Sequence, residues 1–213
     1  MYPLPFAQTE ARLGSPNRDH HFLHTNVFLR YAGGISGEAE HYIETILTQA
    51  AAAKRRVWAS SILFAQLRPS MFVPGRFDSL DDLARHIQSL ATLVTPDPNT
   101  MLRVARLRDA KWQRPAIAGE AEEKPRTLSF GDAIEIASAL WVKEAARVAD
   151  LKFLMFDDVS PADAKAGGRL SLLRLQDYAR DARANSDVMA AVQLTRIEPL
   201  LRANPVPQSA PAE

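Results

Sequence analysis

Short apolar segments alternate with longer amphipathic segments along this chain, and this alternation limits the folds open to it. The apolar segments have three to eight residues, which is typical of strands that are covered on both faces. They lie at 21–23, 57–60, 92–94 and 151–158. Apolar residues with helical spacing occupy the intervals, at 27–32, 38–56, 79–91, 99–114 and 130–147. Strands that alternate with helices predict a parallel sheet of about four or five strands with helices on both sides, a three-layer α/β/α fold.

The two ends of the chain depart from this pattern. Residues 1–20 are rich in proline and polar side chains and predict a flexible arm, and 204–213 predict a disordered tail. We expect one domain over 21–160. The segment 161–203 has helical spacing over much of its length, so we expect a helical extension that packs on the domain. A fifth strand at "RLSLLRL" (169–175) is the alternative.

Composition excludes several classes of protein. The chain of 213 residues has no cysteine, which excludes disulfides, thiolate metal sites and cysteine nucleophiles. Its formal net charge of +1 creates no overall field toward nucleic acid or membrane, although segregated charges would still form a basic surface. No uninterrupted apolar run reaches the roughly 20 residues of a membrane helix. These features predict a cytoplasmic protein with no membrane partner.

Polar side chains gather where the expected strands end. In chain order they are His24, Thr25, Asn26, Gln66, Asp132, Asp157 and Asp158. Because the carboxyl ends of parallel strands meet at one edge of a sheet, we expect these side chains to share a pocket. Clustered carboxylates repel one another unless a positive charge lies among them, and oxygen ligands suit Mg²⁺ or Mn²⁺.

In these segments the chain resembles the PIN-domain nucleases, many of which are ribonucleases of bacterial toxin–antitoxin pairs. "FLHTNVFLRY" is similar to the opening strand of the family, where the usual triplet is Asp-Thr-Asn. "VWASSILFAQL" is similar to the second strand and helix, which usually carries a glutamate where Gln66 stands. "TLSFGDAIEIASAL" places Asp132 at the third acidic position, and "FLMFDD" places Asp157 at the fourth. The resemblance covers roughly 21–160 and leaves out both ends of the chain.

The resemblance implies four acids that hold one or two divalent ions, Mg²⁺ or Mn²⁺, which activate a water for attack on an RNA phosphodiester. His24 and Gln66 replace two of these acids, whereas Asp132 and Asp157 remain as metal ligands and Asn26 as a further site residue. RNA, an antitoxin-like protein and a second copy of the chain are the implied partners. Two functions follow: a metal-dependent ribonuclease with weakened activity, or an inactive pseudonuclease that binds RNA or protein.

His24 has three interpretations. It is a metal ligand, or an imidazolium that neutralises Asp132 and Asp157 in place of an ion, or a hydrogen-bonded residue of an inactive pocket. Pairing with carboxylates would favour the charged ring. We favour the two metal-free interpretations, because a carboxylate is the usual anchor for a hard cation.

The other site residues also have structural alternatives. Gln66 keeps an oxygen ligand but loses the charge. Thr25 and Asn26 are predicted to satisfy backbone groups at the turn from strand to helix, and Asn26 has the further option of orienting a metal-bound water. Asp132 at a helix start is also explained by capping. Glu135, one turn further on the same face, either replaces the charge lost at Gln66 or is simply exposed.

Basic residues dominate one side of the helix expected over 99–114. They are Arg103, Arg106, Arg108, Lys111 and Arg114, and they project opposite Met101, Leu102, Ala105 and Trp112. A weak nucleic-acid site is therefore expected at Arg103, Arg106 and Lys111, although a solvated charged face is the commoner meaning. We attribute the run Lys54-Arg55-Arg56 to the basic end of the preceding helix, and we expect Trp58 and Trp141 in the core.

Overall fold

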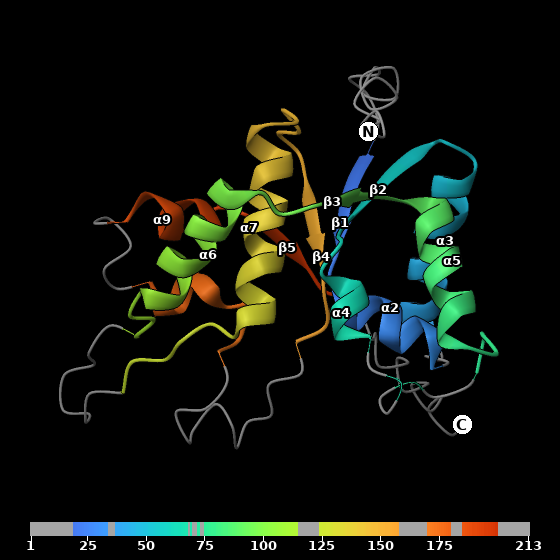
Figure 1. Ribbon diagram of the computed structural model, residues 1–213, viewed down its shortest axis with the longest axis horizontal. Coiled ribbons are helices and arrows are strands. Elements are labelled where there is room, and N and C mark those ends of the chain that lie inside the picture. The colour runs from blue at the N-terminus through green and yellow to red at the C-terminus, as the bar shows by residue number, and fades with distance from the viewer. Residues whose placement is uncertain are drawn as a thin grey trace, which may run out of the picture.

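Five parallel strands form the central sheet of the molecule (Figure 1). The computed structural model describes residues 19–33, 37–67, 69, 72, 75–114, 124–157, 170–179 and 185–199. The strands are β1 (Asp19–Leu23), β2 (Arg55–Ser60), β3 (Ala91–Val94), β4 (Lys152–Leu154) and β5 (Thr195–Ile197). Their order in the sheet is β3-β2-β1-β4-β5, and every neighbouring pair is parallel. The predicted three-layer α/β/α fold is confirmed.

Helices cover both faces of the sheet (Figure 1). They are α2 (Thr25–Ala32), α3 (Glu38–Ala51), α4 (Leu63–Gln66), α5 (Leu80–Leu90), α6 (Pro98–Asp109), α7 (Phe130–Glu144), the 3₁₀ helix η2 (Leu175–Tyr178) and α9 (Ser186–Val192). One layer contains α2, α3 and α5, and the other contains α6, α7 and α9. No helix in the described part of the chain is long and apolar enough to cross a membrane.

Strand side chains alternate between two hydrophobic cores, because successive residues of a strand point to opposite faces. Phe22 and Phe153 lie in the core shared with α6, α7 and α9, and their rings stack with centroids 5.4 Å apart. Leu23 and Leu154, the next residues in β1 and β4, lie in the core shared with α2, α3 and α5. Each fully buried side chain of this size contributes about 1.5–3 kcal/mol to folding.

The basic run at 54–56 was predicted to end a helix, and this prediction was wrong. Helix α3 ends at Ala51, and Lys54 lies in the turn that follows. Arg55 and Arg56 are the first two residues of β2. The helix ends early because Ala53 adopts a left-handed conformation (φ 55°), which lets the Lys54 N–H donate back to the Gln49 carbonyl at 2.8 Å.

The buried face of α6 differs from the expected one. Thr100, Val104 and Leu107 point into the core, whereas Met101, Leu102 and Ala105 are exposed. The physical reason is that Arg103 and Arg106 form ion pairs with Asp187 at the start of α9, which sets the rotation of α6 about its axis. Trp112 is buried as expected but lies beyond the end of α6. The prediction that Trp141 lies in the core was wrong, since 37% of it is exposed, whereas Trp58 is buried as predicted.

The fifth strand comes from a different segment than the one considered. Of "RLSLLRL", residues 170–175 are described and form no strand; Leu170, Leu172 and Leu175 pack into the core beside α7. Strand β5 follows α9 and pairs with β4. The expected arm up to residue 18, the tail from residue 204 and Asp158 lie outside the described residues.

Candidate functional site

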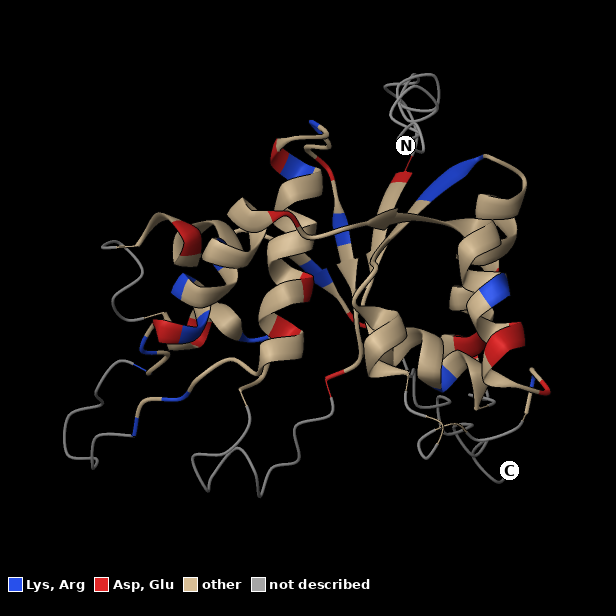
Figure 2. Ribbon diagram, viewed as in Figure 1, with Lys and Arg blue, Asp and Glu red and all other residues tan. Residues whose placement is uncertain are grey.

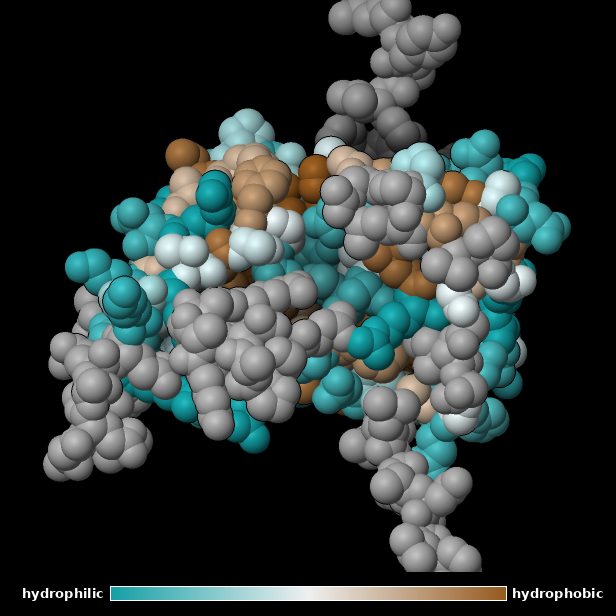
Figure 3. All heavy atoms as spheres, turned by 90° about the horizontal axis from the view of Figure 1, so that it is seen from below, coloured by the Kyte–Doolittle hydropathy of each residue, from teal (hydrophilic) through white to brown (hydrophobic). Residues whose placement is uncertain are grey.

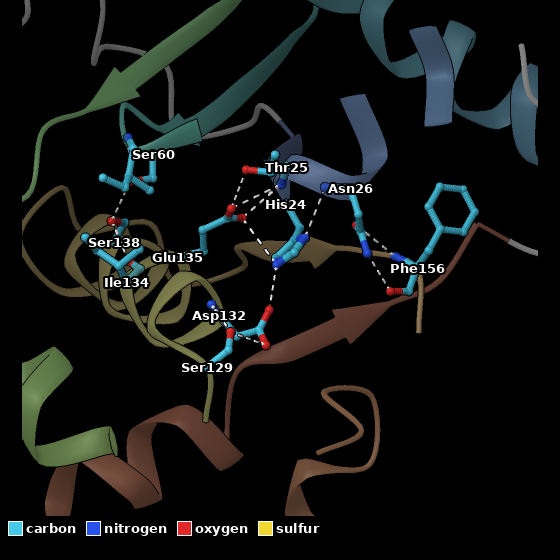
Figure 4. A network of polar contacts seen from close by, with 11 residues as sticks. His24, Thr25, Asn26, Ser60, Ser129, Asp132, Ile134, Glu135, Ser138 and Phe156 are labelled. Atoms are coloured by element: carbon cyan, nitrogen blue, oxygen red, sulfur yellow. Dashed lines mark hydrogen bonds and ion pairs between the residues drawn. The ribbon is translucent and has the colours of Figure 1, made fainter. Parts of the chain in front are cut away.

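His24 lies at the junction between β1 and α2, at the carboxyl edge of the sheet (Figure 4). Its backbone N–H donates to the Leu154 carbonyl at 2.9 Å, which extends the pairing of β1 with β4. Its ring caps α2, because the Asn26 N–H donates to Nδ1 at 3.2 Å. Since Nδ1 accepts this bond, the proton of the neutral ring belongs on Nε2, which faces α7.

Two carboxylates of α7 converge on this nitrogen. Asp132 Oδ1 lies 3.2 Å and Glu135 Oε2 lies 3.6 Å from His24 Nε2. All three side chains are buried, so water screens these interactions very little. The residues at positions 132 and 135 are one helical turn apart and therefore face the same side of α7. The result is a buried network of one imidazole and two acids, which we call the His24 network.

Glu135 also binds the start of α2. The Thr25 N–H donates to both carboxylate oxygens, at 3.0 and 3.3 Å, and the Thr25 hydroxyl donates to Oε1. The first N–H groups of a helix have no partner within the helix, and a negative charge there is favoured by the helix dipole. Glu135 therefore connects α7 to the amino end of α2 as well as to the imidazole.

Asp132 is positioned by Ser129, which caps α7. The Asp132 N–H donates to Ser129 Oγ at 3.0 Å, and the Ser129 hydroxyl donates to Asp132 Oδ2 at 2.7 Å. This reciprocal pair resembles a capping box. The Asp132 carboxylate thus accepts from the capping residue Ser129 through Oδ2, which leaves Oδ1 directed at His24.

Burial and charge act in opposite directions on the network. Burial lowers the pKa of His24, but the nearby Glu135 and Asp132 carboxylates outweigh it and raise this pKa above its ordinary value. Burial raises the pKa of Glu135, against the opposing effects of His24 and Thr25. A second ring proton would have to occupy Nδ1, and it would displace the capping bond from Asn26.

Gln66 and Asp157 make contacts other than those of the His24 network. The Gln66 amide packs against the start of α7: a Cβ added to Gly131 would lie 2.8 Å from Gln66 Nε2. Asp157 accepts a hydrogen bond from the Ser171 hydroxyl, and its N–H donates to Glu198 Oε1 at 3.1 Å. The acids that contact His24 within the described residues are thus Asp132 and Glu135.

Asn26 satisfies backbone groups, which was one of its two predicted roles. Its side-chain amide donates to the Phe156 carbonyl at 2.7 Å, and its Oδ1 accepts from the Phe156 N–H at 3.3 Å. These bonds hold α2 against the segment that follows β4.

Viewed from the carboxyl edge, hydrophilic residues gather in the middle of this face, with hydrophobic residues to either side (Figure 3).

The residues of the site do not fit a divalent cation. Within the described ranges, no group of three or more His, Asp or Glu side chains is arranged to hold a metal ion. His24 Nε2 takes the position between Asp132 and Glu135 that a shared cation would need, Gln66 is neutral, and Asp157 is directed to Ser171. We therefore derive no catalytic step through Mg²⁺ or Mn²⁺.

Glu135 is the member of the network for which the sequence left two interpretations open. It was expected either to replace the charge lost at Gln66 or to be exposed, and the second is wrong because only 1% of it is accessible to solvent. One signal was present: Glu135 lies within the apolar run "AIEIASAL", where a solvated glutamate would be out of place. A buried carboxylate requires a partner, and the partner is in another part of the chain.

The expected nucleic-acid residues of α6 are mostly engaged within the molecule. Arg103 forms ion pairs with Asp187 and with Glu144, both at 2.8 Å, and Arg106 pairs with Asp187. Lys111 is exposed but lies beyond the end of α6. The two arginines therefore join α6 to α9 and α7, and only Lys111 of the three is left without an ion pair in the described part of the chain.

Comparison with known proteins identifies no relative. A scan against models of protein families found no match, and searches of curated proteins and of solved structures found none either.

Proposed function

We propose that this protein is a PIN-like pseudonuclease, related to metal-dependent ribonucleases but without turnover, which acts as an RNA- or protein-binding module. The observation that supports the proposal is the His24 network. An imidazole lies between two buried carboxylates, which raise its pKa and so favour the positive charge that acids at this edge require. The segments that carry the resemblance lie in and beside three adjacent strands of the sheet, β2, β1 and β4.

The change at two of the four acidic positions has a direct electrostatic consequence. A hard cation gains its affinity from negatively charged oxygen ligands. With His24 and Gln66 in place of two acids, an ion would have to displace the imidazole and then bind to fewer charges. We expect divalent ions to bind very weakly, so the phosphodiester chemistry implied by the resemblance would be lost.

The alternative is a weak ribonuclease that depends on Mn²⁺. Its support is that Asp132 and Glu135 are directed at one nitrogen and that imidazole is an acceptable ligand for Mn²⁺. An antitoxin-like protein partner, a homodimer and a cytoplasmic location are implications of the resemblance and the composition, and they belong to either alternative.

Calorimetric titration of the full chain with Mn²⁺ and then Mg²⁺ tests the proposal. We expect no binding in the millimolar range and no cleavage of a mixed-sequence RNA. The double variant His24→Asp/Gln66→Glu should bind Mn²⁺, because it adds two carboxylates beside Asp132 and Glu135. Adding Asp132→Asn to this variant should abolish that binding, and circular dichroism would verify that each variant is folded.

The contrary result is equally clear. If the natural chain binds Mn²⁺ and cleaves RNA, and Asp132→Asn removes both properties, the protein is a nuclease and the proposal is wrong. If the double variant is folded but binds no more tightly than the natural chain, the metal site of the implied family is not at these residues.

A further inference from the structure

The charges of this nearly neutral chain are unevenly distributed over the fold. Lysine and arginine positions cluster along the ribbon at the amino ends of β2 and β4 and at the adjoining end of α7 (Figure 2). Among the described residues, the cations there are Lys54, Arg55, Arg56, Lys143, Arg147 and Lys152, and the acids are Asp19, Glu144 and Asp150. We call this set the amino edge. It has an excess of three positive charges, at the opposite end of the strands from the His24 network.

Part of the amino edge is internally paired and part is not. Asp19 lies 3.3 Å from the Arg55 guanidinium and 3.2 Å from the Lys152 ammonium. Glu144 pairs with Arg103 of α6. Lys54 and Arg147 are exposed and form no ion pair within the residues that the structure describes.

The positions of these cations suit an extended polyanion. Lys54 precedes β2 and Arg147 lies in the connection between α7 and β4, with β1 between the two strands. Neighbouring strands are about 5 Å apart, so β2 and β4 are about 10 Å apart. An extended phosphate backbone that crosses the edge from β2 to β4 would meet cations from both sides.

The surroundings favour a nucleic acid over an acidic protein. Protein interfaces have an apolar centre and few lysines, whereas nucleic-acid surfaces are polar and rich in lysine and arginine. Among the described residues the exposed large apolar side chains are Met101, Leu102, Phe130 and Trp141, on α6 and α7. Of these, Trp141 in the last turn of α7 lies beside the amino edge, whose strands and turns expose none.

We propose that the amino edge binds the phosphate backbone of single-stranded RNA, with Lys54 and Arg147 as exposed contacts. This inference rests on the proposed function insofar as that function includes a binding module. It assigns the RNA surface to the edge of the sheet opposite the His24 network, and away from the arginines of α6.

Fluorescence anisotropy with a short fluorescein-labelled RNA of mixed sequence tests the proposal on the full chain, between about 50 and 200 mM KCl. The variant is Lys54→Gln/Arg147→Gln. The matched control is Lys124→Gln/Arg174→Gln, which removes the same charge from one exposed lysine and one exposed arginine elsewhere. Each lost phosphate contact flattens the slope of log K against log salt by about 0.7, so the double variant should lose about 1.4 in slope and about 25-fold in affinity at 0.1 M salt.

The control variant should bind as the natural chain does. The inference is overturned if the natural chain does not bind the RNA, or if both variants lose the same affinity. Tighter binding of a fluorescein-labelled polyglutamate peptide than of RNA would also overturn it and would make the edge a protein-binding surface. Metal titration and RNA cleavage decide the pseudonuclease proposal independently, so the two proposals can fail separately.

Discussion

Glu135 offers the most direct test of the His24 network, through the variant Glu135→Gln. The substitution keeps the size of the side chain and one oxygen that is able to accept from Thr25. It removes the negative charge beside His24 and directs an amide N–H₂ group toward one of the donors that the carboxylate now satisfies. Thr25 donates two groups, its N–H and its hydroxyl, and His24 Nε2 approaches at 3.6 Å.

The expected loss follows from these contacts. Leaving one buried donor without an acceptor costs about 1–3 kcal/mol, and removing one partner of a buried ion pair costs about 3–5 kcal/mol. Because the variant keeps one acceptor and His24 keeps Asp132, we expect a loss of about 3 kcal/mol in the free energy of unfolding, the value at which the two ranges meet. That is a large share of the about 5–15 kcal/mol that stabilises an ordinary domain.

Urea unfolding at neutral pH measures this loss as a lower midpoint with an unchanged slope. Glu38→Gln is the matched control: Glu38 is exposed in the first turn of α3, and its charge there contributes about 0.5 kcal/mol. Adding His24→Gln completes a double-mutant cycle, with an expected coupling of about 1–3 kcal/mol. A loss below about 0.5 kcal/mol for Glu135→Gln, or independent effects of the two substitutions, would refute the argument that the His24 imidazole takes the place of a cation beside Glu135.

Three further predictions concern other parts of the molecule. Burial and the neighbouring Arg55 lower the pKa of His21 to about 4, so the neutral ring is favoured by folding. The contribution of the neutral His21 ring to the free energy of unfolding is complete above the ordinary pKa of 6.5. It is lost as the pH falls from 6.5 to about 4, which is a change of about 3 kcal/mol. In urea unfolding measured across this pH range, His21→Gln should remove that change. Asp187→Asn should lower the free energy of unfolding by about 2–3 kcal/mol, because the carboxylate binds two arginines of α6; an unchanged thermal midpoint would contradict this. Gly75→Ala should cost about 1–3 kcal/mol, because its Cβ would lie 2.8 Å from the carbonyl oxygen of Ala32, whereas Gly33→Ala, with its nearest atom at 3.5 Å, should cost less in the same measurement.

Local patterns were sufficient to predict most of the secondary structure. The apolar segments that became β1 to β4 and the helical spacing of the segments between them are properties of consecutive residues. Ser79 and Ser129 cap α5 and α7, and such caps depend only on residues three positions away. The location of His24 at the carboxyl edge also follows from the order of strand, polar triplet and helix.

Features that depend on distant partners could not be obtained in this way. The rotation of α6 is set by Asp187, which lies more than 80 positions away along the chain. Strand β5 has three residues, too few to show a period, and pairs only because α9 brings it beside β4. The expectation for these elements failed because helix faces and short strands are chosen by what packs against them.

The His24 network shows most clearly which features follow from the sequence alone and which depend on the tertiary structure. The sequence by itself determined that a histidine follows β1 and that an acid opens α7, since both positions are fixed by local structure. Only the tertiary structure decided that Glu135 is buried against Thr25 and His24, and that Asp157 is directed to Ser171. The physical reason is that a buried charge is tolerated only where an opposite charge or a hydrogen-bond donor contacts it. Thr25 and Glu135 are 110 positions apart along the chain, so only the folded structure brings them into contact.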